Sequence, residues 1–180
     1  DTQIGLSFTY MLHPMLGVEV LAATPFNHDI NATGALAGAG KLGETKHLPP
    51  TVSAQFYPLG GTSSAIQPYI GLGLNYTLFF EEKTTPTLTG AIGALADMQG
   101  VSGVTATATK LALDDSIGLA GQLGADIKIT DRMGFNAAVW WVDIDTTGTI
   151  TADTNVGTVT SKVDVEIDPY VYMIGAYVKF

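Results

Sequence analysis

Apolar and polar residues alternate along most of the chain, which is the pattern of β-strands with one apolar face. The apolar side of the first such segment carries Ile4, Leu6, Phe8, Tyr10 and Leu12. Segments rich in Gly, Pro, Thr or Asp separate the successive runs of alternation. The pattern predicts seven strands, at residues 1–12, 16–26, 50–58, 66–80, 114–129, 133–146 and 162–180.

The connections between these strands are alternately short and long. We expect tight turns near residues 13–15, 58–65 and 130–132, and long loops at residues 27–48, 81–113 and 146–161. Bacterial outer-membrane barrels have this asymmetry, with short periplasmic turns and long extracellular loops. A short helix is weakly indicated inside the second long loop, at residues 88–98. Residues 1–180 are expected to form one barrel domain.

Aromatic residues gather at both ends of the predicted strands. Those near the short turns are Tyr10, Phe56, Phe135 and Phe180, and those near the long loops are Phe26, Tyr76, Phe80, Trp141, Tyr170 and Tyr172. Two aromatic belts around an aliphatic band are typical of a surface that meets two lipid–water interfaces. The alternative, a soluble barrel or sandwich, would place its polar residues outside.

The predicted number of strands is odd, which indicates that the barrel contains one further strand. Single-chain bacterial barrels have an even number of strands, because an open edge in hydrocarbon leaves backbone groups unsatisfied. We therefore expect an all-β fold, an eight-stranded antiparallel transmembrane β-barrel, with seven strands in this chain and the N-terminal strand missing. A second interpretation makes part of the loop at 81–113 a wall strand, for example Val101–Lys110, although that segment lacks apolar alternation.

Composition narrows the class of protein. Among 180 residues there are 8 Lys and Arg against 17 Asp and Glu, for a formal net charge of −9, and there is no Cys. An acidic chain without a basic stripe argues against a nucleic-acid partner. The absence of Cys excludes a disulfide scaffold and any thiolate nucleophile or metal ligand.

The sequence shows no catalytic or cofactor motif. His13 falls in a turn and His28 and His47 in a loop, none of them beside a Ser in a triad-like arrangement, so no enzyme activity and no cofactor are expected. His28 and His47 alone are a weak indication of a metal site. An acidic rim could bind divalent cations between lipopolysaccharide phosphates, although a solvated loop is the simpler interpretation; it comprises Asp143, Asp145, Asp153, Asp164 and Asp168.

The inward faces of the strands predict a lumen in two parts. A hydrophobic constriction on the long-loop side is predicted from Leu21, Phe79, Trp140, Val142 and Met173. A polar floor on the short-turn side, in which acids and bases pair across a narrow lumen, is predicted from Glu19, Asp126, Lys128 and Lys179. Pro49 and Pro50 cannot donate to a strand ladder, so they predict either a local gap in the wall or simply the end of the loop outside the membrane.

Several runs resemble the outer membrane protein W (OmpW) family, in particular its OprG-type members. They are DTQIGLSFTYM, GVEVLAATPFNH, HLPPT, QPYIGLGLNYTLFF, DSIGLAGQLGAD, NAAVWWVDIDTT and DPYVYMIGAYVKF. The resemblance implies an eight-stranded barrel, a constriction at Leu21 and Trp140, and a lateral opening at the proline motif. The chain departs from the family pattern at residues 84–109, which look expanded.

The resemblance and the lumen together suggest an outer-membrane channel for the uptake of small hydrophobic molecules, which leave through a lateral gap. The alternatives are a diffusion channel for small amino acids or other polar solutes, and a surface receptor or adhesin without a transport role. The expected partners are outer-membrane lipid, lipopolysaccharide, small hydrophobic solutes and the barrel assembly machinery. The expected location is the outer membrane of a Gram-negative bacterium.

Overall fold

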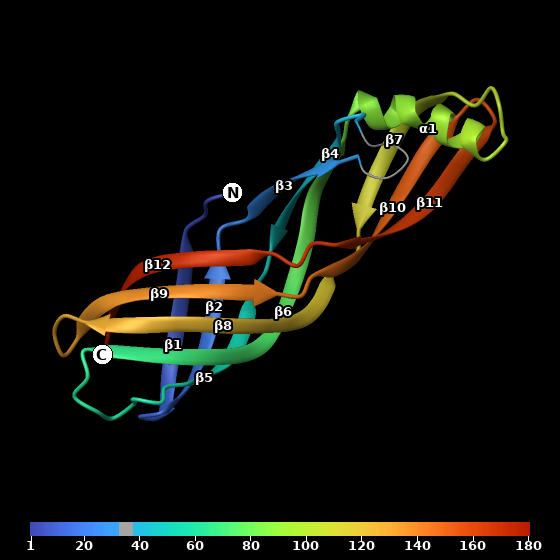
Figure 1. Cartoon of the computed structure of the whole chain (residues 1–180). Coiled ribbons are helices and arrows are strands. Elements are labelled where there is room, and N and C mark those ends of the chain that lie inside the picture. The colour runs from blue at the N-terminus through green and yellow to red at the C-terminus, as the bar shows by residue number, and fades with distance from the viewer. Residues whose placement is uncertain (33–37) are drawn as a thin grey trace.

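A curled antiparallel sheet, which we call the wall, forms the body of the molecule in a computed structural model that describes residues 1–32 and 38–180 (Figure 1). Its strands follow one another in the order β1-β2-β5-β6-β8-β9-β12. Their bounds are Gly5–His13 for β1, Leu16–Ala23 for β2, Thr51–Phe56 for β5, Ile66–Thr84 for β6, Ser116–Lys128 for β8, Met133–Val142 for β9 and Tyr170–Val178 for β12. The predicted antiparallel sheet of wall strands is confirmed, with shifted ends.

The wall turns its apolar side outward. Leu72, Leu123 and Ile174 are 66%, 64% and 86% exposed, whereas the inward-facing Gln55 and Tyr69 are 2% and 1% exposed. An apolar exterior around a polar interior is the reverse of a water-soluble barrel and suits a surface that lies in lipid. Among the residues that the structure describes, no helix is long and apolar enough to cross a bilayer.

A second layer of structure extends from the long-loop end of the wall (Figure 1). β3 (Phe26–Asn31) and β4 (Lys41–Leu48) form a hairpin, and β4 also pairs with the upper part of β6. Residues 33–37 of the predicted loop at 27–48 lie outside the described residues. The hairpin prolongs the wall beyond its apolar band, on strand β6.

A separate three-stranded sheet stands beside this hairpin, in the order β11-β10-β7. β10 (Asp145–Thr154) and β11 (Gly157–Glu166) make up most of the connection predicted as a loop at 146–161. The prediction of one wall strand over 162–180 is therefore wrong, because that stretch contains the end of β11 and then β12. The chain changes direction between them at Asp168, whose φ is +38°, and at Pro169, which has no N–H for a ladder.

The connection at 81–113 contains the end of β6, the helix α1 (Pro86–Met98) and β7 (Ala106–Leu113). Thr85 caps the helix, since its Oγ accepts a hydrogen bond from the Leu88 N–H at 3.4 Å. The short helix predicted at 88–98 is confirmed. β7 overlaps the segment considered as an extra wall strand, but it pairs with β10 only, so that second interpretation is wrong.

Candidate functional site

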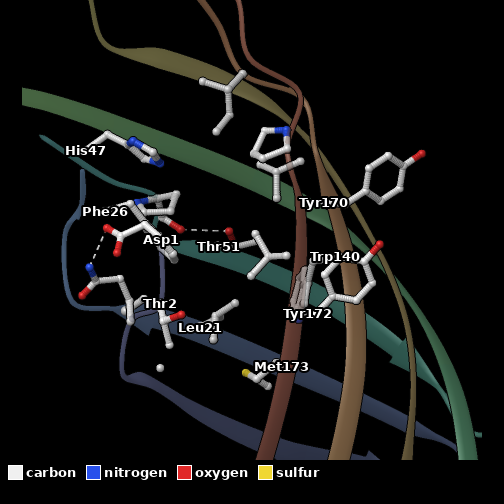
Figure 2. A pocket seen from close by; sticks show the side chains of 18 of the residues that line it. Asp1, Thr2, Leu21, Phe26, His47, Thr51, Trp140, Tyr170, Tyr172 and Met173 are labelled. Carbon is white, nitrogen blue, oxygen red and sulfur yellow. Dashed lines mark hydrogen bonds between the residues drawn. The ribbon is translucent and has the colours of Figure 1, made fainter. Parts of the chain in front are cut away.

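A cavity of about 400 Å³ lies inside the wall at its junction with the outer layer (Figure 2). Strands β2, β9 and β12 contribute most of its apolar surface. The side chains that form this surface are Leu21, Phe26, Trp140, Val142, Ile144, Val171 and Met173. The volume is near the lower end of the range of small-molecule pockets, about 300–1,000 Å³. The space therefore suits a small apolar guest.

Four of the five residues predicted to form the constriction line this cavity. Leu21, Trp140, Val142 and Met173 face it, because each occupies an inward position of its strand. Trp140 is only 1% exposed and belongs to the buried apolar cluster of the lumen. Phe79 belongs to the same cluster, 8% exposed, but lies behind the cavity surface.

The two prolines lie where the ladder of the wall is interrupted on one side. Pairing of β2 with β5 ends at Leu21 and Thr51, and pairing of β3 with β4 begins at Phe26 and His47. Between these pairs no residue of 48–50 is matched to β2 or β3. On the other side the pairing continues, since the Tyr76 N–H donates to the Pro50 carbonyl oxygen at 3.0 Å.

Pro49 lines the cavity, and its carbonyl oxygen accepts a hydrogen bond from the Thr51 hydroxyl at 3.1 Å (Figure 2). Proline is tolerated at such a position because the missing N–H would have no ladder partner. The interruption and the cavity thus share a boundary at Pro49.

Two histidines form a stack at the edge of the cavity. The rings of His28 and His47 are 4.6 Å apart between centroids and inclined by 15°, and both residues line the cavity. Phe26 and Phe79 approach the His47 ring with centroid distances of 5.5 and 5.8 Å. The two histidines are in contact, as a metal site would require, but their rings stack face to face within an aromatic cluster.

Burial sets the charge of this pair. Desolvation in the aromatic cluster, and to a lesser extent the neighbouring His28, lowers the pKa of His47 from 6.5 to about 4. The pKa of His28 is also lowered, again chiefly by burial. Both rings are therefore neutral at physiological pH, and each offers one hydrogen-bond donor and one acceptor.

Acidification is expected to loosen the β3–β4 hairpin. Between pH 6.5 and 4, His47 binds a proton in the opened hairpin but stays neutral in the closed hairpin. The closed form therefore loses stability as the pH falls through this window, by up to about 3 kcal/mol, and keeps it above the window. Hydrogen exchange of β4 amides, corrected for intrinsic rates, measures this change. A His47→Phe variant should show a much weaker dependence, and equal protection of the wild-type hairpin at pH 4.5 and 7 would contradict the assignment.

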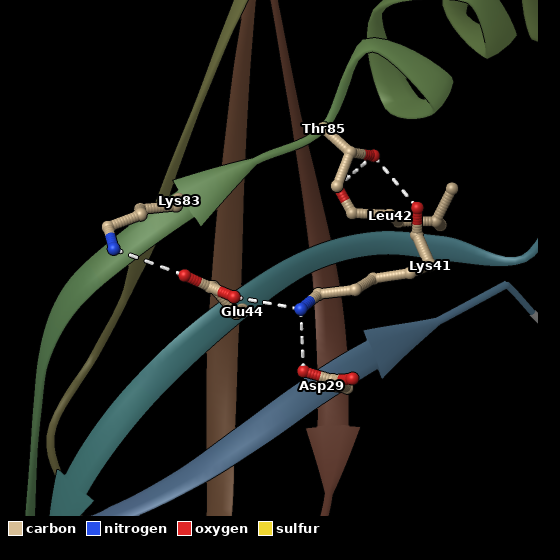
Figure 3. Close-up of polar contacts among 6 residues, drawn as sticks. All are labelled: Asp29, Lys41, Leu42, Glu44, Lys83 and Thr85. Atoms are coloured by element: carbon tan, nitrogen blue, oxygen red, sulfur yellow. Dashed lines mark hydrogen bonds and ion pairs between the residues drawn. The ribbon is translucent and has the colours of Figure 1, made fainter.

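Exposed ion pairs hold the outer hairpin over the wall (Figure 3). The Lys41 ammonium lies 2.7 Å from Asp29 and 2.8 Å from Glu44, and the Lys83 ammonium lies 3.1 Å from Glu44. The lysines lower the pKa of the Glu44 carboxyl, so the pairs persist at neutral pH. The Thr85 hydroxyl donates to the carbonyl oxygens of Lys41 and Leu42, which ties the start of α1 to β4. Each pair is weak in water, but together they connect β3, β4 and β6.

Below the cavity, a network of amides surrounds a buried carboxylate. The side chain of Glu19 is 3% exposed, and its Oε2 accepts from Gln55 Nε2 at 2.7 Å and from Gln122 Nε2 at 3.0 Å. Gln55 Nε2 also donates to Gln122 Oε1, and the Tyr57 hydroxyl donates to Gln55 Oε1 at 3.1 Å. These bonds cross the lumen from β2 to β8.

The network continues across the remaining strands. Gln122 Nε2 donates to the Tyr69 hydroxyl at 3.3 Å, and Asn136 Nδ2 donates to the same hydroxyl at 2.9 Å and to Asp126 Oδ1 at 2.8 Å. The predicted polar floor therefore contains Glu19 and Asp126, but neutral amides and tyrosines satisfy them.

The structure does not bring the two predicted lysines into this network. Within the described residues, no ion pair involves Lys128 or Lys179. Lys179 is exposed, with its ammonium 5.7 Å from the centre of the Tyr177 ring. Both lysines lie at the short-turn end of their strands, and in the part of the chain that the structure describes neither forms the direct pair with an acid that the sequence predicts.

Sequence reasoning missed Tyr69 and Gln122 as parts of the floor, although a signal for them exists. Tyr69 pairs with Gly124 and Gln122 with Gly71 in the ladder. A Cβ atom at Gly124 would lie 2.5 Å from the Tyr69 ring, and one at Gly71 would lie 2.7 Å from Gln122 Oε1. Large inward residues opposite glycines on the next strand thus indicate side chains that cross the lumen.

The acidic rim is only partly assembled. Carboxylate oxygens of Asp143, Asp145 and Asp168 lie within 4.8 Å of one another. Asp153 in β10 and Asp164 in β11 are not part of this group. Asp168 Oδ1 accepts a hydrogen bond from the Ile144 N–H at 3.1 Å. This bond fixes the corner between β11 and β12, which gives Asp168 a structural role.

An apolar exterior, a hydrogen-bonded polar interior and an antiparallel sheet whose strands β6, β8 and β9 are long enough to cross a bilayer define a transmembrane β-barrel protein. The sequence profile of the OmpW family matches residues 1–180. Outer membrane protein W of Vibrio cholerae is 43% identical over 181 residues, which cover 100% of this chain and 74% of that protein. The chain therefore belongs to the OmpW family, and it is a protein of the Gram-negative outer membrane.

Solved structures agree with this assignment. The crystal structure of OprG from Pseudomonas aeruginosa is 47% identical with a TM-score of 0.82, over 100% of this chain and 78% of that one. The solution structure of Escherichia coli outer membrane protein W is 38% identical with a TM-score of 0.59, over 100% and 81%. Outer membrane protein AlkL, solved in DMPC bilayers, is 18% identical with a TM-score of 0.61 over 99% and 72%, and shares the fold.

Proposed function

We propose that this protein is a channel for small hydrophobic molecules, which enter the cavity from outside the cell and leave sideways into the outer leaflet of the membrane. The observation that carries the proposal is the boundary shared by the apolar cavity and the interrupted ladder at Pro49. No catalytic step is part of this role. Its partners are the hydrophobic solute and outer-membrane lipid, with lipopolysaccharide around the outer rim and the barrel assembly machinery during biogenesis.

The floor supports a lateral exit rather than a straight one. An apolar solute that reaches Leu21 and Trp140 would next meet the amide network around Glu19. Passing the network would break the hydrogen bonds around the buried Glu19 side chain, each worth about 1 kcal/mol net, without replacing them. Moving from the cavity into lipid keeps the solute in apolar surroundings throughout.

Restoring the missing donors at the prolines tests the lateral route. The double variant Pro49→Val, Pro50→Val supplies two N–H groups at the interruption, and we expect the rate of uptake of a labelled hydrophobic solute into vesicles to fall about tenfold, the effect of a barrier about 1.4 kcal/mol higher. Pro58→Val, in the exposed turn after β5, is the matched control and should keep the wild-type rate. The full-length protein is used throughout, with empty vesicles as the baseline.

Two results would contradict the proposal at different levels. Wild-type uptake no faster than in empty vesicles would exclude transport of that solute class. Wild-type uptake above baseline with an unchanged rate in the double variant would exclude the exit at the prolines.

A further inference from the structure

Two nitrogen atoms on the lining residues of the cavity are buried without a hydrogen bond. Among the residues that the structure describes, neither His47 Nδ1 nor Trp140 Nε1 has a partner, and the two side chains are 2% and 1% exposed. A buried polar group without a partner costs about 1–3 kcal/mol. Both side chains line the same cavity, and the two nitrogen atoms are themselves covered, so a small turn of either ring would offer an unsatisfied donor or acceptor to a polar group on a guest.

Figure 2 shows the His47 imidazole pointing from its strand toward the cavity, near Phe26. The second ring of the stack, His28, also lines the cavity. Asp1, Gln3 and Thr51 also bring polar groups to the lining, whereas Leu21, Val171 and Met173 offer no strong hydrogen-bonding group. The cavity is thus apolar over most of its surface and polar at one end.

We propose that the cavity selects small apolar molecules that carry one hydroxyl group, with His47 as the residue that recognises the hydroxyl. This inference rests on the proposed transport of hydrophobic molecules and narrows it to a substrate class. The neutral imidazole accepts from, or donates to, a hydroxyl, and the aromatic residues Phe26 and Trp140 contact the apolar body. A pure hydrocarbon of the same shape fits the cavity but leaves the imidazole nitrogen unpaired.

The ring stack explains why a histidine serves here better than a flexible polar residue. Phe26, His28 and Phe79 hold the His47 ring from several sides, at centroid distances of 5.5, 4.6 and 5.8 Å. A polar group that the surrounding rings confine to a narrow range of orientations before binding loses little conformational entropy when the guest arrives. The aromatic surroundings also keep the ring neutral, so it does not demand a counter-ion.

A matched pair of probes tests the inference: p-cresol and p-xylene, which differ by a hydroxyl in place of a methyl group. The ratio of p-cresol to p-xylene uptake by the full-length protein in vesicles, each corrected for empty vesicles, is compared between variants. We expect His47→Phe to lower this ratio about fivefold, the effect of one neutral hydrogen bond. His47→Asn places an amide near the Nδ1 position and should restore most of the ratio. His13→Phe, at the end of β1 and outside the cavity lining, should leave it unchanged.

A measurement on the wild-type protein covers the case in which a variant fails to fold. The ¹⁵N signals of the His47 imidazole should shift on addition of p-cresol and stay in place with p-xylene. An unchanged uptake ratio in His47→Phe, or equal ¹⁵N shifts with both probes, would overturn the role of His47 while leaving hydrophobic transport intact. Failure of both probes to pass faster than in empty vesicles would instead refute the proposed function itself.

Discussion

A Gly73→Ala variant is expected to lose about 3 kcal/mol of unfolding free energy, because the wall has no room for one methyl group there. A Cβ atom at Gly73 would overlap the carbonyl oxygen of Val52 and lie 2.7 Å from Ser53 Cα. These are backbone atoms of β5, the neighbouring strand, so β5 and β6 would have to separate. Urea unfolding in lipid vesicles, followed by Trp fluorescence, measures the loss.

Gly175→Ala is the matched control. Gly175 also lies in a wall strand, β12, but a Cβ atom there would meet no atom within 4 Å. We expect this variant to unfold at the wild-type urea concentration or slightly above it, because alanine restricts the unfolded chain. Equal losses in the two variants would show that strand propensity, rather than the contact with β5, determines the cost.

A Glu19→Ala variant is expected to open the floor of the lumen. The change removes the single oxygen that accepts from both Gln55 and Gln122, at 2.7 and 3.0 Å, and leaves two buried amides without that partner. We expect a loss of about 2 kcal/mol in unfolding free energy and a clear rise in the leak of labelled glycine from vesicles. The rise follows because the network no longer fills the lumen.

Glu19→Gln tests whether the floor is closed by the hydrogen bonds to the two amides or requires the acidic group itself. A glutamine keeps one acceptor oxygen for the two amides, so the floor should stay closed and the glycine leak should remain near the wild-type value. A wild-type protein that already passes glycine rapidly would favour the polar-solute channel over the lateral route. No change in leak for Glu19→Ala would mean that the network is not the seal.

The wall was predictable because one simple rule governs it. Every wall strand has one face toward lipid, so apolar residues recur at every second position, as at Leu72 and Leu74 of β6. The outer layer follows no such rule. Strand β11 is exposed along almost its whole length, and Ser161 interrupts the alternation of its valines, so no continuous apolar face separates it from a loop.

The sequence predicted which side chains of the site face the lumen. It did not predict their height along the barrel or the partners that they contact. Alternation showed that Glu19, Trp140 and Lys128 face inward, yet the choice of partner depends on strand stagger, which the pattern does not contain. The contact of His28 with His47 depends on the register of a hairpin whose Gly- and Ala-rich connection does not specify one turn type. Glycine positions opposite large residues, as for Tyr69 and Gly124, are the one part of this information that the sequence does hold.

The separate ladder of β7, β10 and β11 has a consequence for which positions can vary among related proteins. Within residues 1–32 and 38–180, none of these three strands pairs with a wall strand. Mutations selected by antibodies or bacteriophages can therefore accumulate on the exposed face of β11 without disturbing a hydrogen bond of the membrane-embedded sheet. We expect substitutions on β11 to be tolerated independently of the wall, and related strains to differ most between residues 157 and 166.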